Sequence, residues 1–212
     1  MAVKIIVDVG SNHMANKDYA IEHIKVAKDC GADAVKFQLF KDKPPNIELP
    51  REWFPDLVDY GRKTNIEVFA SAFDTEAEDL MWLAGCESIK FAYKHPFEGK
   101  KLHPFKTIYA SFDVMNRPSL KIDKLKKLYC IQEYPIKYEI SFDGIFPLFD
   151  GFSDHTLGFG QTLKAVINGA KIIEKHFCID RPNIDCPDSR FAIRPKQLEE
   201  MIKQIRMFEC AY

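Results

Sequence analysis

The feature that most constrains the fold is a pattern that recurs along the whole chain: a short run of β-branched or aromatic residues, a turn, and a stretch with the period of a helix. Alternating strands and helices are typical of a parallel sheet covered by helices. Eight such runs in 212 residues favour a compact (β/α)8 TIM barrel, an α/β fold, over an open sheet. The predicted strands are Lys4–Val9, Ala34–Leu39, Glu67–Ser71, Ser88–Ala92, Thr107–Ser111, Lys127–Gln132, Leu148–Ser153 and Lys171–Phe177.

Five helices of ordinary length are predicted between or after these strands. Gly31, Gly85 and Gly169 each end a helix shortly before a strand, where glycine is the usual residue. Thr75 is the expected N-cap of the helix that begins at Glu76. The predicted helices are Lys17–Cys30, Arg51–Thr64, Glu76–Ala84, Leu157–Gly169 and Pro195–Phe208.

The middle of the chain leaves little room for helices. The fourth helix of the barrel has to fit within His95–Lys106 and the fifth within Asn116–Lys126, while Asp143–Pro147 is long enough only for a turn. We therefore expect shortened helices and one thinly covered side of the barrel. A second copy of the chain, or a separate partner chain, is one way to cover such a side.

Composition argues against several classes of partner. The 30 Lys plus Arg residues are balanced by 31 Asp plus Glu, so no basic face for nucleic acid or an anionic membrane is implied. No apolar run approaches the roughly 18 residues that span a bilayer, and the start of the chain lacks the regions of a signal peptide. Six cysteines without a C-x-x-C pair indicate reduced thiols, with Cys130 and Cys178 as small core residues of strands. We expect a single domain over residues 1–212, in the cytoplasm.

Two histidines are placed where neighbouring strands should end. His155 follows an apolar run that ends at Phe152, and His176 lies near the end of the last predicted strand. The helix predicted over Leu157–Gly169 makes this a βαβ unit, so the two strands should be parallel and adjacent. Their carboxyl ends then point to the face where barrels keep their active sites, and two imidazoles there favour a divalent metal.

Charged and polar residues also lie near the carboxyl ends of other predicted strands. Such residues are costly inside a barrel unless they are paired or meet a ligand. Any one of them alone is explained more simply by an internal salt bridge or an outward face. Together they favour a pocket for an anion and a metal. They are Asp8, Lys36, Gln38, Lys90 and Glu174.

The remaining histidines weigh less in the argument. His13 follows the first strand, where it either orients a substrate or caps the loop, and the sequence leaves both open. His23 in the first helix and His103 beside Pro104 are expected to be structural or solvated.

Several short segments follow one another in a specific order through most of the chain: 9–13 (VGSNH), 31–38 (GADAVKFQ), 71–74 (SAFD), 89–90 (IK), 133–135 (EYP), 153–158 (SDHTLG), 169–177 (GAKIIEKHF) and 187–188 (PD). In this order they resemble the barrel domain of the sialic acid synthases (N-acetylneuraminate synthases) and of their pseudaminic and legionaminic acid relatives. Ordered motifs of this kind are highly specific.

The resemblance implies a transferase that joins phosphoenolpyruvate to an open-chain aldose, N-acetylmannosamine or another amino sugar, giving a nonulosonic acid and phosphate. It implies that His155 and His176 hold a divalent metal, Mn²⁺ or else Mg²⁺ or Co²⁺, which polarises the aldehyde and helps deliver the attacking water. Lys36 and Lys90 would bind the phosphate and carboxylate of phosphoenolpyruvate. The implied catalytic residues are Asp8, His95, Tyr134 and Glu174, and the implied substrate-binding residues are Lys36, Gln38, Ser71, Lys90, Ser111, Gln132, Ser153 and Asp188.

The chain departs from the family pattern at several positions. The strand-one glutamate is Asp8, one methylene shorter, and the serine and glutamate after the fourth strand are Tyr93 and His95. A histidine can still transfer protons near neutral pH. The S-T-G-M motif after the fifth strand is reduced to residues 111–115 (SFDVM), and the glycine of N-H-x-G is Ala15. The C-terminal antifreeze-like domain that usually supplies a sugar-binding arginine is expected to be absent.

Three functions stay open on this basis. The leading interpretation is a compact phosphoenolpyruvate-dependent synthase whose acceptor sugar has changed, because the altered residues are those that would contact the sugar. The second is a catalytically weakened relative that binds a metal or an anion and acts through a protein partner, which Tyr93 and His95 favour. The third is a different metal-dependent aldolase or lyase built on the same histidine pair.

Overall fold

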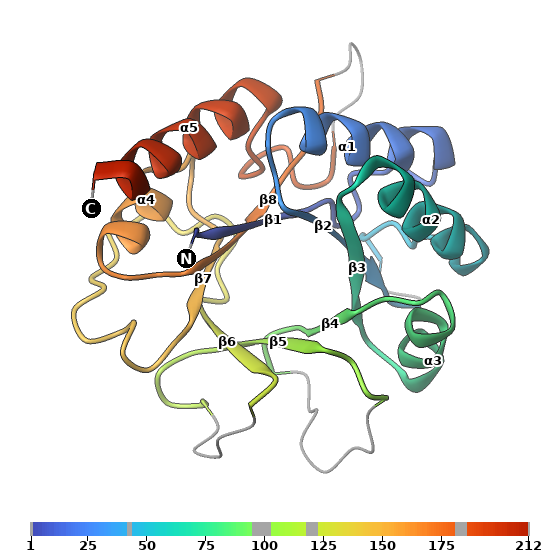
Figure 1. Ribbon diagram of the computed structural model, residues 1–212, viewed down its shortest axis with the longest axis horizontal. Helices are drawn as coiled ribbons and strands as arrows, with labels where there is room; N and C mark the ends of the chain where they lie inside the picture. The colour runs from blue at the N-terminus through green and yellow to red at the C-terminus, as the bar shows by residue number, and fades with distance from the viewer. Residues whose placement is uncertain (1, 42–43, 95–102, 118–122, 181–185, 212) are drawn as a thin grey trace.

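Eight parallel strands form a closed barrel in which each strand pairs with its neighbours in chain order and β8 pairs with β1 (Figure 1). The computed structural model describes residues 2–41, 44–94, 103–117, 123–180 and 186–211. The predicted TIM barrel is confirmed. The strands are β1 (Lys4–Asp8), β2 (Ala34–Leu39), β3 (Glu67–Ala72), β4 (Ser88–Phe91), β5 (Thr107–Phe112), β6 (Leu125–Cys130), β7 (Gly151–Asp154) and β8 (Ile172–His176).

The described helices cover one side of this barrel. They follow one another around its outside from α4 through α5, α1 and α2 to α3 (Figure 1). None of them is both long and apolar enough to cross a membrane. Their bounds are α1 (Lys17–Asp29), α2 (Phe54–Thr64, preceded by a 3₁₀ turn over Arg51–Trp53), α3 (Thr75–Leu83), α4 (Gly160–Ile167) and α5 (Pro195–Ala211).

The other side of the barrel has little helical cover. Strands β4, β5, β6 and β7 follow one another with no helix between them among the described residues, and the outer side of β5 and β6 is bare of helices in Figure 1. The predicted fourth helix falls mostly on residues 95–102, outside the described part. The fifth, predicted over Asn116–Lys126, is wrong at its end, because β6 begins at Leu125, which pairs with Ile108 of β5.

Some element boundaries differ from the predicted ones for local reasons. Asp74, not Thr75, caps α3, because its carboxylate accepts the N–H of Ala77 at 2.9 Å. Helix α4 begins three residues later than predicted, since Gly158 has a φ of +61°, which an α-helix does not allow. Strand β6 lies two residues earlier than predicted, and β7 begins only at Gly151.

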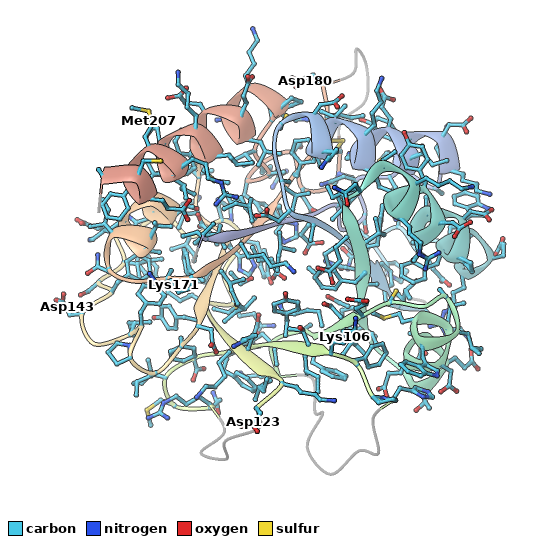
Figure 2. The ribbon with its side chains drawn as sticks, viewed as in Figure 1. Lys106, Asp123, Asp143, Lys171, Asp180 and Met207 are labelled. Carbon is cyan, nitrogen blue, oxygen red and sulfur yellow. A yellow bond between two sulfur atoms is a disulfide. The ribbon has the colours of Figure 1, made fainter. Side chains whose placement is uncertain are left out.

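Side chains fill the inside of the ring of strands (Figure 2). At the amino-terminal end Lys4 pairs with Glu67 at 2.6 Å, and above them the rings of Phe69 and Tyr109 stack with centroids 5.4 Å apart. Below its carboxyl-terminal layer the barrel is therefore a packed core, as expected for this fold. The buried charges that follow lie on top of that core.

The cysteines differ in part from the expectation. Cys178 and Cys186 are joined by a disulfide, so the expectation of reduced thiols is wrong for this pair. Cys178 also lies two residues past the end of β8 rather than within a strand. Cys130 is buried in β6 as predicted, and it is free, like Cys30, Cys86 and Cys210.

Candidate active site

A cavity of about 550 Å³ opens at the carboxyl ends of the strands. The parallel register places the ends of all eight strands at this face, so residues distant in sequence meet in one wall. Every predicted site residue that the structure describes lines this cavity, and His95 lies outside the described residues. The lining predicted residues are Asp8, Lys36, Gln38, Ser71, Lys90, Ser111, Gln132, Tyr134, Ser153, His155, Glu174, His176 and Asp188.

Two buried lysines and one glutamate form the floor of the cavity. Lys90 Nζ donates to Glu174 Oε1 at 3.0 Å and to the hydroxyl of Ser111 at 2.8 Å. Lys36 Nζ lies 3.8 Å from Glu174 Oε2 and donates to the hydroxyl of Ser71 at 3.0 Å. Ser153 donates its hydroxyl to Glu174 Oε1 at 2.7 Å. The side chains of Lys36, Lys90 and Glu174 are each no more than 5% exposed, so the cluster is buried at the bottom of the cavity.

The opposite charges in this cluster stabilise one another in their ionised forms. Burial alone would lower the pKa of Lys36, but the carboxylates of Asp8 and Glu174 outweigh it and raise the pKa above its usual value. Burial alone would raise the pKa of Glu174, but Lys36, Lys90 and the Ser153 hydroxyl hold it well below the usual range. Both side chains are therefore charged at neutral pH.

Asp8 reaches the cluster in spite of its short side chain. Its Oδ2 accepts from Lys36 Nζ at 2.6 Å and from Gln38 Nε2 at 3.2 Å, and its Oδ1 accepts from the N–H of Gly10 at 2.9 Å. The same Oδ2 lies 3.6 Å from His176 Nε2. Asp8 thus joins the lysine floor to the histidines.

The two predicted histidines face one another across the cavity wall, with ring centroids 5.5 Å apart. His155 Nδ1 bonds to the carbonyl of Ile131 at 2.9 Å, and burial lowers the pKa of this histidine to about 4. The ring is therefore neutral at pH 7, with Nδ1 as the donor and Nε2 carrying a lone pair. His176 Nδ1 lies 2.9 Å from Asp188 Oδ2; burial alone would lower its pKa, but Asp8 and Asp188 outweigh it and raise it.

This donor set fits a divalent metal that is only partly bound by protein. In both rings Nδ1 is engaged by an oxygen, an arrangement that orients metal-binding histidines and leaves Nε2 for the ion. Among the described residues, no three or more His, Cys, Asp or Glu side chains are grouped so as to hold a metal on their own. Water and substrate oxygens would have to complete the coordination, as at catalytic rather than structural sites.

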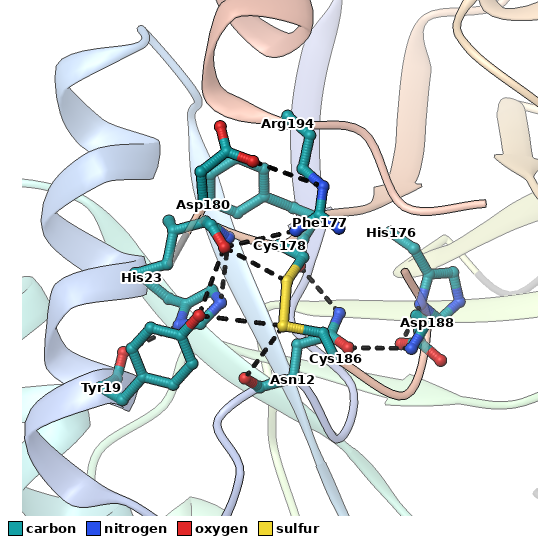
Figure 3. Close-up of a disulfide and its surroundings, with 11 residues drawn as sticks. Asn12, Tyr19, His23, His176, Phe177, Cys178, Asp180, Cys186, Asp188 and Arg194 are labelled. Carbon is teal, nitrogen blue, oxygen red and sulfur yellow. Dashed lines mark hydrogen bonds and ion pairs between the residues drawn. A yellow bond between two sulfur atoms is a disulfide. The ribbon is translucent and has the colours of Figure 1, made fainter. Parts of the chain in front are cut away.

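Asn12 and a disulfide hold Asp188 beside His176 (Figure 3). Asn12 Oδ1 accepts the N–H of Asp188 at 3.1 Å, and Asn12 Nδ2 donates to the carbonyl of Phe177 at 2.9 Å. The Cys178–Cys186 disulfide ties the chain just before Asp188 to the end of β8. The position of the carboxylate is therefore fixed from both the β1 and the β8 side.

Gly10 leaves no room for a side chain at this point. Its φ is +52°, and a Cβ there would lie 2.7 Å from Asp188 Oδ2. Gly10→Ala should displace Asp188 from His176, at about 1–2 kcal/mol of backbone strain. If these histidines hold Mn²⁺, its binding should weaken about tenfold or more, as on loss of such partners.

Titration calorimetry with Mn²⁺ measures this effect. Gly144→Ala is the matched control, because Gly144 has φ of +70° and open space around its Cβ position. It should show the strain without the loss of affinity. Equal Mn²⁺ affinity in the two variants would contradict the role given to Gly10.

Comparison with known proteins places this site in a family. The model of the NeuB family matches residues 102–212, just over half of the chain. This chain belongs to the NeuB family. It is 29% identical to the N,N'-diacetyllegionaminic acid synthase of Campylobacter jejuni, with 98% of this chain and 76% of that protein covered. It is also 29% identical to a pseudaminic acid synthase of Campylobacter jejuni strain 81-176, with 99% and 74% covered.

The solved structures agree on the fold of this NeuB-family chain. The N-acetylneuraminic acid synthetase of Leptospira borgpetersenii superposes with a TM-score of 0.79 at 23% identity, covering 98% of this chain and 84% of that one. The resemblance drawn from the motifs is confirmed, and the chain is a sialic-acid-synthase-like enzyme.

The departures from the NeuB pattern after β4 have a structural outcome at Tyr93. Its hydroxyl donates to the carboxylate of Asp113, which follows β5, and its ring lines the cavity. The loops after β4 and β5 are therefore tied together by a phenol where the resembling family has a serine. Tyr134, which follows β6, lies beside the histidines, with its ring 4.1 Å from the ring of His155 and 5.5 Å from that of Phe191.

Sequence reasoning missed several residues that line the cavity or support its wall. Asn12 and Gly10 were visible in the VGSNH motif, but nothing in the sequence showed that they would meet Asp188 from the other end of the chain. Apolar and small residues of the wall gave no signal at all, because they look like any core residue. They are Phe40, Phe73, Ala92, Cys130 and Phe191.

The other histidines have structural roles among the described residues. His13 is buried and accepts the N–H of Ala15 at its Nδ1, at 3.1 Å, so of the two roles left open it caps the loop. It does not line the cavity. His103 lies 2.7 Å from Asp79 and stacks on Trp82, which confirms its structural assignment.

Acid is expected to weaken the fold through His23. This buried ring satisfies the carbonyl of Tyr19 at 2.8 Å and the N–H of Ile179 at 3.5 Å only when it is neutral. Burial lowers its pKa from 6.5 to about 4, so between these pH values the unfolded chain binds a proton that the folded chain does not. As the pH is lowered from 7 to 5, the free energy of unfolding should therefore decrease by about 2 kcal/mol because of this side chain.

Urea unfolding at both pH values, with His23→Gln beside the unchanged protein, measures this contribution. Between pH 7 and pH 5, the free energy of unfolding of the variant should decrease by about 2 kcal/mol less than that of the unchanged protein. An identical loss in both proteins would show that His23 is not the group responsible.

Proposed function

We propose that this NeuB-family chain condenses phosphoenolpyruvate with an open-chain amino sugar to give a nonulosonic acid and phosphate, using a divalent metal such as Mn²⁺. The observation that carries the proposal is one cavity that joins a two-lysine floor to a pair of histidines. The names of the relatives, which are legionaminic and pseudaminic acid synthases, support the reaction class.

The lysine floor suits a small, highly charged anion. An ammonium group has three N–H donors. Among the described residues Lys36 donates to Asp8 and Ser71, which leaves one donor for an anion. Lys90 donates to Ser111 and to both carboxylate oxygens of Glu174, and it would share these bonds with the anion. The hydroxyls of Ser71, Ser111 and Ser153 flank the two ammonium groups. Phosphoenolpyruvate carries a phosphate and a carboxylate close together, so each ammonium group can take one of them.

Glu174 supports the reacting end of this anion. Its depressed pKa keeps it ionised, so it is unsuited to donate a proton at neutral pH. A fixed negative charge beside the lysines would instead stabilise positive charge that develops at C2 of phosphoenolpyruvate when C3 attacks the sugar aldehyde. Water then adds its oxygen at C2 and the C2–O bond to the phosphate breaks; of the two protons of the water, one goes to the aldehyde oxygen and the other leaves with the phosphate.

The histidine side of the cavity is the place for the sugar. His155 and His176 would hold the metal, which when bound supplies Lewis-acid polarisation of the aldehyde. Tyr134 and Asp188 border the same space, and Asp188 orients His176 through the bond to its Nδ1. The proton-transfer role of His95 stays a prediction, since this residue lies outside the described part.

Phosphate release from phosphoenolpyruvate tests the proposal. The chain is incubated with Mn²⁺ and a panel of N-acetylated and plain aldoses, against a control with chelator. We expect release that requires both the metal and one aldose. Mass spectrometry of the product should show the sum of the aldose and a pyruvyl unit.

Two outcomes would contradict the proposal. Binding of phosphoenolpyruvate without turnover on any aldose would favour a weakened relative that acts through a partner. Cleavage of a keto-acid sugar without phosphate chemistry would favour an aldolase.

A further inference from the structure

A buried ion pair lies on the outer face of the barrel directly behind the two histidines. Asp154 of β7 and Lys175 of β8 are register partners, and Lys175 Nζ lies 3.2 Å from Asp154 Oδ2. Both side chains are 0% exposed. Because side chains alternate along a strand, the next residues, His155 and His176, point to the cavity. We call Asp154 and Lys175 the outer pair.

The outer pair forms hydrogen bonds with the N–H, the hydroxyl and the carbonyl of Thr156, the residue that follows His155. Asp154 Oδ1 accepts both the N–H and the hydroxyl of Thr156 at 2.7 Å. Lys175 Nζ donates to the carbonyl of Thr156 at 2.5 Å. Asp154 Oδ2 also accepts the hydroxyl of Thr162 at 2.5 Å, which connects the pair to α4. All hydrogen-bonding groups of Thr156 are therefore taken up.

These contacts leave the imidazole of His155 little freedom. Its peptide carbonyl accepts the N–H of Ile136 at 3.0 Å, and its ring is bonded to Ile131. The outer pair fixes the chain on one side of His155, and the strand end of β6 fixes it on the other. Lys175 in turn immediately precedes His176, so one ion pair links the backbones that carry both rings.

Stability alone does not explain the outer pair. Burying two charges is costly, and an apolar pair of similar volume is often as stable or more stable. In some proteins a buried polar or ionic group instead fixes one arrangement among several.

We propose that Asp154 and Lys175 are positioning residues that set the separation of His155 and His176 for a single divalent cation. This inference rests on the metal role given above to the histidines. It assigns a function to residues that touch neither substrate nor ion.

The test compares Mn²⁺ affinity in three proteins, measured from the spin-resonance signal of free Mn²⁺. They are the unchanged chain, Asp154→Asn/Lys175→Met, and Lys4→Met/Glu67→Gln as a matched control at the other end of the barrel. The first double variant removes both charges together, so no lone charge stays buried, and it should keep its thermal unfolding midpoint near that of the control variant. We expect it to bind Mn²⁺ at least tenfold more weakly, and the control to bind like the unchanged chain.

Thr162→Val is a milder probe that keeps the ion pair and should fold whatever the double variant does. It removes one hydrogen bond to Asp154 and should weaken Mn²⁺ binding by about threefold. Affinity within a factor of 1.5 of the unchanged chain, in Thr162→Val and in a folded double variant, would overturn the inference. Absence of Mn²⁺ binding in the unchanged chain would overturn the metal role as well. Binding without turnover would count against the proposed reaction alone.

Discussion

Replacing Glu174 with glutamine is expected to lower the free energy of unfolding by about 3–5 kcal/mol at pH 7, the range found when one partner of a buried ion pair is removed. The amide keeps the size of the side chain but leaves Lys36 and Lys90 without the carboxylate between them. Urea unfolding followed by circular dichroism measures the loss. An anion that occupies the floor should restore part of it, so added phosphoenolpyruvate should stabilise the variant more than the unchanged chain.

The pH dependence gives this prediction a second readout. The folded pKa of Glu174 is depressed, so its contribution is present above the usual value of 4.5 and is lost as the pH falls below it. The difference in the free energy of unfolding between the variant and the unchanged chain should therefore become smaller in acid.

Glu76→Gln serves as control, because this exposed partner of Lys41 should cost less than about 1 kcal/mol. An equally small loss in the free energy of unfolding for Glu174→Gln would mean that the charge of Glu174 does not stabilise the two lysines.

Replacing His155 and His176 together with alanine should abolish turnover. If the ion that they hold supplies several kcal/mol of transition-state stabilisation, its loss reduces the rate by about 10³-fold or more. Phosphate release by the double variant should match that of the unchanged chain under chelation, and Mn²⁺ should no longer bind in calorimetry.

His103→Ala provides the matched control for this pair. His103 is a histidine paired with Asp79 and stacked on Trp82, outside the cavity. Its variant should retain both metal binding and turnover. If the double variant at His155 and His176 kept its metal-dependent turnover, those histidines would not hold the ion.

The barrel and most of its site were predictable because both follow from local patterns. Strands and helices can be recognised from the pattern of neighbouring residues. In a closed barrel of parallel strands, the carboxyl ends of all strands then lie at one face. The positions of Lys36, Lys90 and Glu174 within their predicted strands were therefore enough to place them in one pocket, although their actual partners were not known.

What the sequence did not show depends on contacts between distant segments. The disulfide between Cys178 and Cys186 was not foreseen either, because the two cysteines form no C-x-x-C pair or other recognisable spacing. The meeting of Asn12 with Asp188 joins residues 176 positions apart. The N-cap of α3 failed for a different reason: Asp74 and Thr75 are both good caps, and only the backbone geometry chooses between them.

The uneven cover of the barrel has a consequence for how it moves. Lys90 and Ser111 come from β4 and β5, on the side with little helical cover, whereas Lys36 and Glu174 come from β2 and β8, which the helices support. Transient separation of β4 and β5 from β3 would move Lys90 and Ser111 away from Lys36 and Glu174. An anion bound by both ammonium groups connects the two sides of this break, so bound substrate should slow the exchange of amide hydrogens in β4 and β5.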